Sequence, residues 1–248
     1  MFKSKSSTGI LISITMLALI ISQVFSQASP SGTQTGQSLD VVNGINVVTF
    51  VDGAFNTGWT DVSGVTDDPL VSGVGPGTSS FDGSSTQNNG GNPNAYRETT
   101  HTVVNGDRIY TGGLNSFAVY TPSDSGAITS IDFASDLLHP DSGSTGWFLL
   151  LKQNGVLYFA GRGQAFGNST WQSFTLDALT EEDFDTSAPG LGPNNVHPDF
   201  STNGASITFG YVMTNSSPGT NQLTHGIDNW SVTINTSPFQ IFLPVILR

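Results

Sequence analysis

Apolar and polar side chains alternate along most of the chain, which is the period expected of β-strands. In the segment 205–214, every second residue is large and apolar: Ile207, Phe209, Tyr211 and Met213. The segment 226–234 repeats this pattern with Trp230, Val232 and Ile234. Successive side chains of a strand point to opposite faces, so each segment predicts a strand with one buried face.

Two apolar runs, 146–152 and 156–161, flank the pair Asn154–Gly155. Asn-Gly is the dipeptide that most readily takes the positive φ angles of a two-residue hairpin turn. The segment therefore predicts a β-hairpin. Both runs are apolar on both parities, which predicts central strands that are covered on each face and do not lie at an edge.

Weaker patterns complete the predicted order of elements. Strands are expected at 47–51, 59–62, 115–121, 127–133 and 170–178, and a helical turn capped by Thr180 is expected at 179–184. The Gly-, Ser- and Asn-rich stretch 71–94 predicts a long loop. In the segment 170–178, Trp171 falls on the polar parity with Ser173, which predicts an exposed tryptophan and a candidate binding residue.

The ends of the chain differ in composition from its middle. Residues 1–28 have the basic start, apolar run and small-residue cleavage motif of a secretory signal peptide, and its removal would leave no membrane-spanning segment. Residues 29–44 predict a flexible leader, 45–236 a single β-domain, and 237–248 an apolar tail. We therefore expect a secreted protein that acts outside the cell or at its surface.

Composition narrows the class of protein and of partner. Removal of the signal peptide would leave five basic residues against 19 acidic ones, a net charge of −14, which disfavours binding to nucleic acid. The chain has no cysteine, which excludes disulfides and thiol chemistry and is typical of bacterial more than animal exported domains. Few charges and many turn residues favour an all-β fold, a two-sheet antiparallel sandwich.

Two short motifs resemble those of extracellular β-sandwich families. The segment 226–234 resembles the closing strand of carbohydrate-binding modules, galactose-binding-like jelly rolls and laminin B type domains, and 92–97 is similar to the opening motif of the laminin B type. The resemblance implies a jelly-roll-like sandwich with a binding or adhesive function. It also implies a structural calcium ion, with Asp228 and Asp52 as candidate ligands. The alternative is that Asp228 caps a turn through its own backbone.

The C-terminal segment 239–248 resembles a Phe-Leu-Pro-Val-x-Leu-Arg tail found on exported proteins of some bacteria. A tag for sorting or surface attachment and an ordinary last strand are both compatible with it.

A sugar site needs aromatic faces and nearby polar groups. Five residues are candidates for it: Trp171, Tyr120, Trp59, Arg162 and Asn168. The alternative for the aromatic residues is packing beneath loops, which is the more common role.

An enzyme is one alternative to a binding module. The segments 96–98 and 158–161 faintly resemble two strands of alginate-lyase-like jelly rolls, but Ala160 replaces the lysine of the second motif, and the acidic chain disfavours an anionic substrate. No pair of carboxylates suited to a glycosidase stands out. We therefore expect a secreted, non-catalytic module that binds a carbohydrate or a cell-surface or matrix polymer. A polysaccharide lyase and a structural surface protein without a small ligand remain the alternatives.

Overall fold

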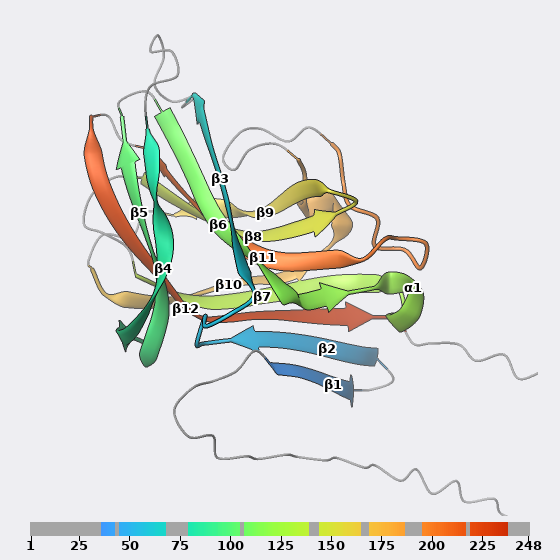
Figure 1. The fold of residues 1–248 in the computed structure, drawn as a ribbon. Helices are drawn as coiled ribbons and strands as arrows, with labels where there is room; N and C mark the ends of the chain where they lie inside the picture. Colours follow the sequence, from blue (N-terminus) through green and yellow to red (C-terminus); the bar gives the residue numbers. More distant parts are fainter. Residues whose placement is uncertain are drawn as a thin grey trace, which may run out of the picture. The chain divides into compact units, whose positions relative to one another are not determined.

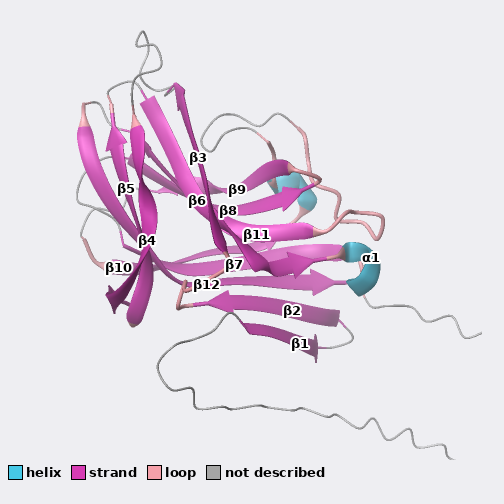
Figure 2. Cartoon of the chain, viewed as in Figure 1, coloured by secondary structure: helices cyan, strands magenta, loops and turns pink. Residues whose placement is uncertain are grey.

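The alternating segments form two antiparallel β-sheets that pack face to face in the computed structural model (Figures 1 and 2). The structure describes residues 36–42, 45–67, 79–104, 107–138, 144–164, 169–186, 195–216 and 219–237. All of them belong to the unit Gly32–Arg248. The predicted two-sheet antiparallel sandwich is confirmed.

Twelve strands and two short helical turns make up the described part of the chain. The strands are β1 (Gly36–Val42), β2 (Ile45–Asp52), β3 (Trp59–Asp67), β4 (Ser80–Gly91), β5 (Asn94–Val103), β6 (Asp107–Tyr120), β7 (Ile128–Leu138), β8 (Ser144–Gln153), β9 (Val156–Gln164), β10 (Trp171–Leu179), β11 (Ile207–Ser216) and β12 (Asn221–Thr236). The helical turns are α1 (Pro122–Ser125) and η1 (Glu181–Asp183). The turn η1 is the predicted one, and a capping box joins Thr180 to Asp183.

The seven-stranded sheet is organised around β12. On one side, β12 pairs first with β5, over 221–227, and then with β2, over 230–236. On the other side, it pairs with β7, and β10 continues the sheet beyond β7. The change of partner falls at Asp228 and Asn229, where the register shifts and Asn229 has a φ of 49°. We call this point the fork, because the sheet divides there into a β5–β4 arm and a β2–β1 arm.

The five-stranded sheet has the order β3-β6-β11-β8-β9. The predicted hairpin is confirmed as β8 and β9, and Asn154 and Gly155 have φ angles of 52° and 81° at its turn. The strand β8 is central, but the prediction for β9 is wrong, because β9 lies at the edge of the sheet. An isolated bridge between Phe159 and Asp185 covers part of that edge. This cover explains why so apolar a strand as β9 can lie at the edge of a sheet.

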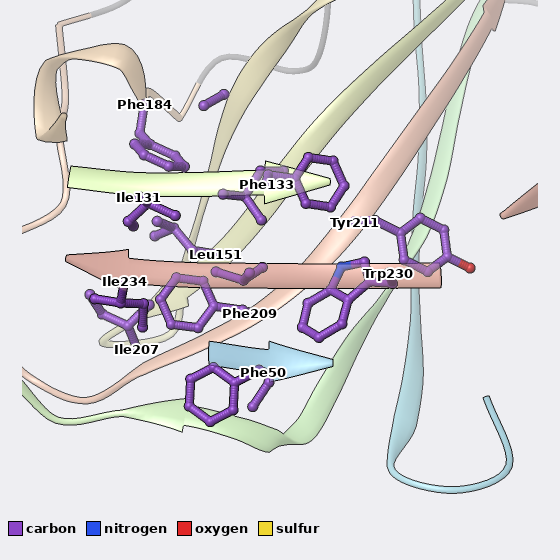
Figure 3. Close-up of a cluster of buried hydrophobic side chains, with 14 of the residues drawn as sticks. Phe50, Ile131, Phe133, Leu151, Phe184, Ile207, Phe209, Tyr211, Trp230 and Ile234 are labelled. Atoms are coloured by element: carbon purple, nitrogen blue, oxygen red, sulfur yellow. The ribbon is translucent and has the colours of Figure 1, made fainter. Parts of the chain in front are cut away.

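The space between the sheets is filled by aromatic and branched side chains (Figure 3). The inward parity predicted for β11 and β12 is confirmed, since Phe209, Tyr211 and Trp230 are all buried. Trp59 stands edge-on to Trp230, with ring centroids 5.3 Å apart and planes at 87°. Aromatic pairs of this geometry add to the stabilisation from area burial, so the cluster holds the sheets in register.

A polar layer continues this interior beyond the aromatic cluster. His101 on β5 is fully buried, and its Nδ1 lies 2.5 Å from Asn215 Oδ1 on β11, while its Nε2 lies 2.6 Å from Thr111 Oγ1 on β6. Because an amide oxygen can only accept, Nδ1 donates to it, and Nε2 accepts from the Thr111 hydroxyl. His101 therefore ties the β5 arm to two strands of the opposite sheet.

Two predictions about irregular chain need correction. The loop expected at 71–94 is wrong from Ser80 onward, because the polar segment 80–91 forms β4 and pairs with β5 at the edge of the sheet. Its composition hid the strand, since an edge strand needs few apolar side chains. The chain assigned to a leader also contributes β1, which pairs with β2.

Other predictions lie outside the described residues. These are the signal peptide at 1–28 and all of the C-terminal tail except Ser237. In the described segments, no helix combines the length and apolar character that crossing a membrane requires.

The His101 bridge gives a stability prediction. The variant His101→Leu keeps an apolar volume in the layer but removes both inter-sheet hydrogen bonds, so we expect it to lower the free energy of unfolding by about 2–4 kcal/mol, measured by urea denaturation. His197→Leu is the control, because His197 is exposed and bonds only a loop carbonyl, that of Phe184. Equal losses in the two variants would contradict the bridging role.

Candidate functional site

Trp171 opens β10 on the outer face of the seven-stranded sheet, where the alternation predicted it. Its register partner is Leu138 on β7, and Leu138 pairs in turn with Gly226 on β12. The indole is half-buried, and its Nε1 donates a hydrogen bond of 2.9 Å to the carbonyl of Gly90. This bond fixes the ring relative to the turn between β4 and β5.

Tyr96 on β5 supplies a second ring against Trp171. The ring centroids lie 5.3 Å apart, and the planes meet at 80°. The Tyr96 hydroxyl donates to Glu98 Oε2 over 2.7 Å, and Gln87 Nε2 donates to Glu98 Oε1 over 3.2 Å. Burial, together with the hydrogen bond and charge of Glu98, raises the pKa of Tyr96 to about 12. The phenol is thus neutral and held in place at ordinary pH.

Gly226 provides the floor on which the two rings meet. A Cβ atom at this position would lie 2.9 Å from Trp171 Cη2 and 2.9 Å from Tyr96 Cδ2. Any larger residue would therefore push the rings outward. We refer to Trp171, Tyr96 and Gly226 as the aromatic platform.

Polar side chains on β7, β10 and β12 border the platform. Asp136 accepts hydrogen bonds from Ser173 Oγ at 2.6 Å, from Asn229 Nδ2 at 2.7 Å and from Asn92 Nδ2 at 3.3 Å. Asp228 pairs with Asp136 across the β12–β7 ladder. Burial raises the pKa of Asp228, and the neighbouring Asp136 charge adds to the rise, while the N–H groups of Asn92 and Asn229 oppose it.

Two other aromatic candidates belong to the packing between the sheets, Tyr120 within the core and Trp59 partly buried against it. Tyr120 is buried at 2% exposure, and its hydroxyl donates to the Gly126 carbonyl over 2.7 Å. Trp59 packs among Phe55, Tyr211 and Trp230. Neither ring joins Trp171 on the outer face, and packing accounts for both. Sequence parity alone does not show which of two apolar faces is turned inward.

The two polar candidates are not brought to the platform. Arg162 lies on β9 in the other sheet, opposite Trp147, and the structure describes its backbone alone. Asn168 lies outside the described residues.

The two candidate calcium ligands stand on either side of the fork. Asp52 is 1% exposed, and its carboxylate accepts from the backbone N–H groups of Ala54 and Phe55, from Trp59 Nε1 at 2.8 Å and from Asn115 Nδ2 at 3.4 Å. An ion at Asp52 would have to displace these donors, so Asp52 fits a cation poorly. Asp228 lies beside Asp136, and its two oxygen atoms accept the backbone N–H groups of Asn92 and Asn229, so an ion at Asp228 would also have to displace donors. Within the described ranges, no three His, Asp or Glu side chains gather into a metal site.

The solved structures similar to this chain include several carbohydrate-binding modules. A family 11 module from Clostridium thermocellum, in complex with a β-1,3-1,4-mixed-linked tetrasaccharide, is 11% identical and covers 74% of this chain and 94% of its own, with a TM-score of 0.44. A family 30 module of a Clostridium thermocellum cellulosomal cellulase is 12% identical, with coverages of 70% and 96% and a TM-score of 0.39.

A family 61 module in complex with β-1,4-galactotriose is 8% identical, covers 73% of this chain and 90% of its own, and has a TM-score of 0.34. No family model and no curated protein matches the chain.

The residues of the lyase-like motifs do not converge. Arg97 is buried between the sheets and forms an ion pair with Asp61, whereas Tyr96 and Glu98 project from the opposite face of β5. Tyr158 belongs to the core on the other sheet. These side chains do not form one catalytic group.

Sequence analysis missed most of the platform and its border. Tyr96 and Glu98 share the outward parity of β5, and this alternation was visible in 94–103. Nothing in the sequence indicated that β5 would be separated from β10 by β12 and β7 alone.

The calcium prediction for Asp228 is tested through thermal stability. If Asp228 and Asp136 ligate calcium, millimolar calcium raises the Tm and a chelator reverses the rise, because an ion that binds only the folded state stabilises it. We expect Asp136→Asn to abolish the response. A Tm that calcium and chelator leave unchanged in the wild-type protein would contradict the prediction.

Proposed function

We propose that this protein is a secreted, non-catalytic module that binds carbohydrate through the aromatic platform of the seven-stranded sheet. The observation that carries the proposal is the Trp171–Tyr96 pair, half-buried over Gly226 and bordered by fixed polar side chains. Aromatic rings stack on the C–H faces of sugars, and neighbouring amides, hydroxyls and carboxylates bond the sugar hydroxyls.

The platform is ordered before any ligand arrives. The Trp171 indole is held by Gly90, the Tyr96 hydroxyl by Glu98, and the Ser173 hydroxyl by Asp136. Freezing a flexible side chain on binding costs about 0.5–1.5 kcal/mol, so a site whose side chains are already ordered loses less of its contact energy. This arrangement favours recognition of a ligand by a preformed surface.

Charge around the platform indicates the class of sugar. Glu98, Asp136 and Asp228 all lie on this face. The basic residues of the described segments lie elsewhere: Arg108, Lys152 and Arg162 on the other sheet, and Arg97 buried on the inner face of β5. A neutral polysaccharide therefore fits the site better than one carrying uronate or sulfate groups.

The first prediction from this proposal concerns the two rings. Trp171→Ala and Tyr96→Ala each remove a stacking surface, and we expect each to weaken binding to a polysaccharide selected on a glycan array by about tenfold or more. Affinity gel electrophoresis or calorimetry measures the change. Phe117→Ala is the control, because Phe117 on β6 is 57% exposed but lies in the other sheet. Unchanged affinity in both platform variants would show that the aromatic platform is not the binding site.

The second prediction concerns ligand charge. On a glycan array at low ionic strength, we expect neutral glucans, mannans or galactans to be retained and uronate or sulfated polymers to be excluded. Added salt should narrow the difference, because it screens the exposed carboxylates. Preferential retention of anionic polymers would contradict the proposed specificity, and retention of no glycan at all would favour a structural surface protein.

A further inference from the structure

Asp228 lies at the fork and contacts both the turn and the strand that leave it. Its side chain is fully buried. One carboxylate oxygen, Oδ2, accepts the backbone N–H of Asn92 at 2.5 Å, and the other, Oδ1, accepts the backbone N–H of Asn229 at 2.6 Å. Asp228 therefore joins β12 to the turn between β4 and β5.

The same turn carries the acceptor for Trp171. Gly90 and Gly91 end β4 immediately before Asn92, and the Gly90 carbonyl accepts the indole hydrogen of Trp171. The backbone of Gly91 approaches Asp228 closely, since a Cβ atom there would lie 2.6 Å from Asp228 Oδ2. The turn is thus held against Asp228 on one side and supports Trp171 on the other.

A second path returns from Trp171 to the fork. Ser173, two residues along β10, donates to Asp136 Oδ1, and Asn229 Nδ2 donates both to Asp136 Oδ2 and to the carbonyl of Asn92. Together with the backbone of 90–92 and 171–173, these hydrogen bonds form a closed network. It runs from Asp228 through the turn to Trp171, along β10 to Ser173, and back through Asp136 and Asn229. Networks of this kind hold their members more firmly than isolated bonds do.

We propose that Asp228 is a positioning residue of the aromatic platform, which acts through the β4–β5 turn to place the Trp171 indole. This inference rests on the proposed function for its consequence, sugar binding, but its structural content concerns Trp171 alone. Loss of one acceptor at Asp228 releases the Asn92 N–H or the Asn229 N–H, and the turn then no longer holds the Gly90 carbonyl against the indole. The indole of Trp171 becomes mobile, and affinity for sugar falls because binding must then order this side chain.

The test uses the full secreted chain and the variant Asp228→Asn, which keeps one acceptor oxygen and the size of the side chain. The indole N–H signal of Trp171, assigned in nitrogen–proton NMR spectra by its loss in Trp171→Phe, reports the bond to Gly90. We expect this signal to move toward the position of a solvent-exposed indole, and glycan affinity to fall roughly tenfold.

Asp132→Asn is the matched control. Asp132 lies on β7 with Asp136, and its carboxylate also accepts a backbone N–H, that of Ala178 at 2.7 Å, and an asparagine amide, that of Asn235 at 3.1 Å. We expect this variant to leave both the Trp171 signal and the affinity unchanged. An Asp228→Asn protein whose indole signal and affinity match those of the wild type would overturn the proposal.

A second variant covers the case in which Asp228→Asn does not fold. Asn229→Gly preserves the positive φ of this position and removes only the amide that bonds Asp136 and Asn92. It should shift the Trp171 signal in the same direction by a smaller amount, and an unmoved signal would count against the closed network. The NMR result stands whether or not a glycan is found, whereas Trp171→Ala tests binding itself.

Discussion

The structure depends on one strand changing its partner. β12 is long enough to pair with β5 and β2 in succession along one edge, and it can do so only because the chain breaks register at Asp228 and Asn229. At such a break, backbone N–H groups lose their ladder partners and must find others. The Asp228 carboxylate accepts the backbone N–H groups of Asn92 and Asn229 on one side of the fork. On the other side, the carboxylate of Asp52, the last residue of β2, accepts that of Ala54.

This constraint explains why two carboxylates, those of Asp52 and Asp228, are buried at the fork. A buried carboxylate is costly unless hydrogen bonds satisfy it. Asp52 receives two backbone and two side-chain donors, and its bond to Trp59 also sets the orientation of a ring at the centre of the aromatic cluster. The position of Asp52 at the fork gives it a structural role that needs no ion.

The geometry of the outer face of the seven-stranded sheet also depends on the fork. The turn that Asp228 holds carries the carbonyl that orients Trp171, and Gly226, two residues before Asp228, leaves room for both rings. The inner face of the same arm holds the His101 layer, so the β5 arm is fixed to the opposite sheet while its outer side stays accessible. Rigid support beneath and partial exposure above are what a recognition surface requires.

The sequence alone determined the alternation in β11 and β12, the Asn154–Gly155 turn and the outward direction of Trp171, because these depend on neighbours within a few residues. It also favoured a sandwich, since one apolar parity per strand needs a second sheet to bury it. The sequence predicted neither the strand β4 nor the edge position of β9, because the composition of a strand does not show where in the sheet the strand lies.

The residues that surround Trp171 could not be predicted from the sequence, because they depend on how the strands pair. Tyr96, Asp136 and Asp228 come from three strands far apart in the chain, and their meeting depends on strand order and register, which no local pattern encodes. The same pairing sent Tyr120 and Trp59 inward. Strand order is set by the summed packing of both sheets, and for that reason the site could be read only after the strands were placed.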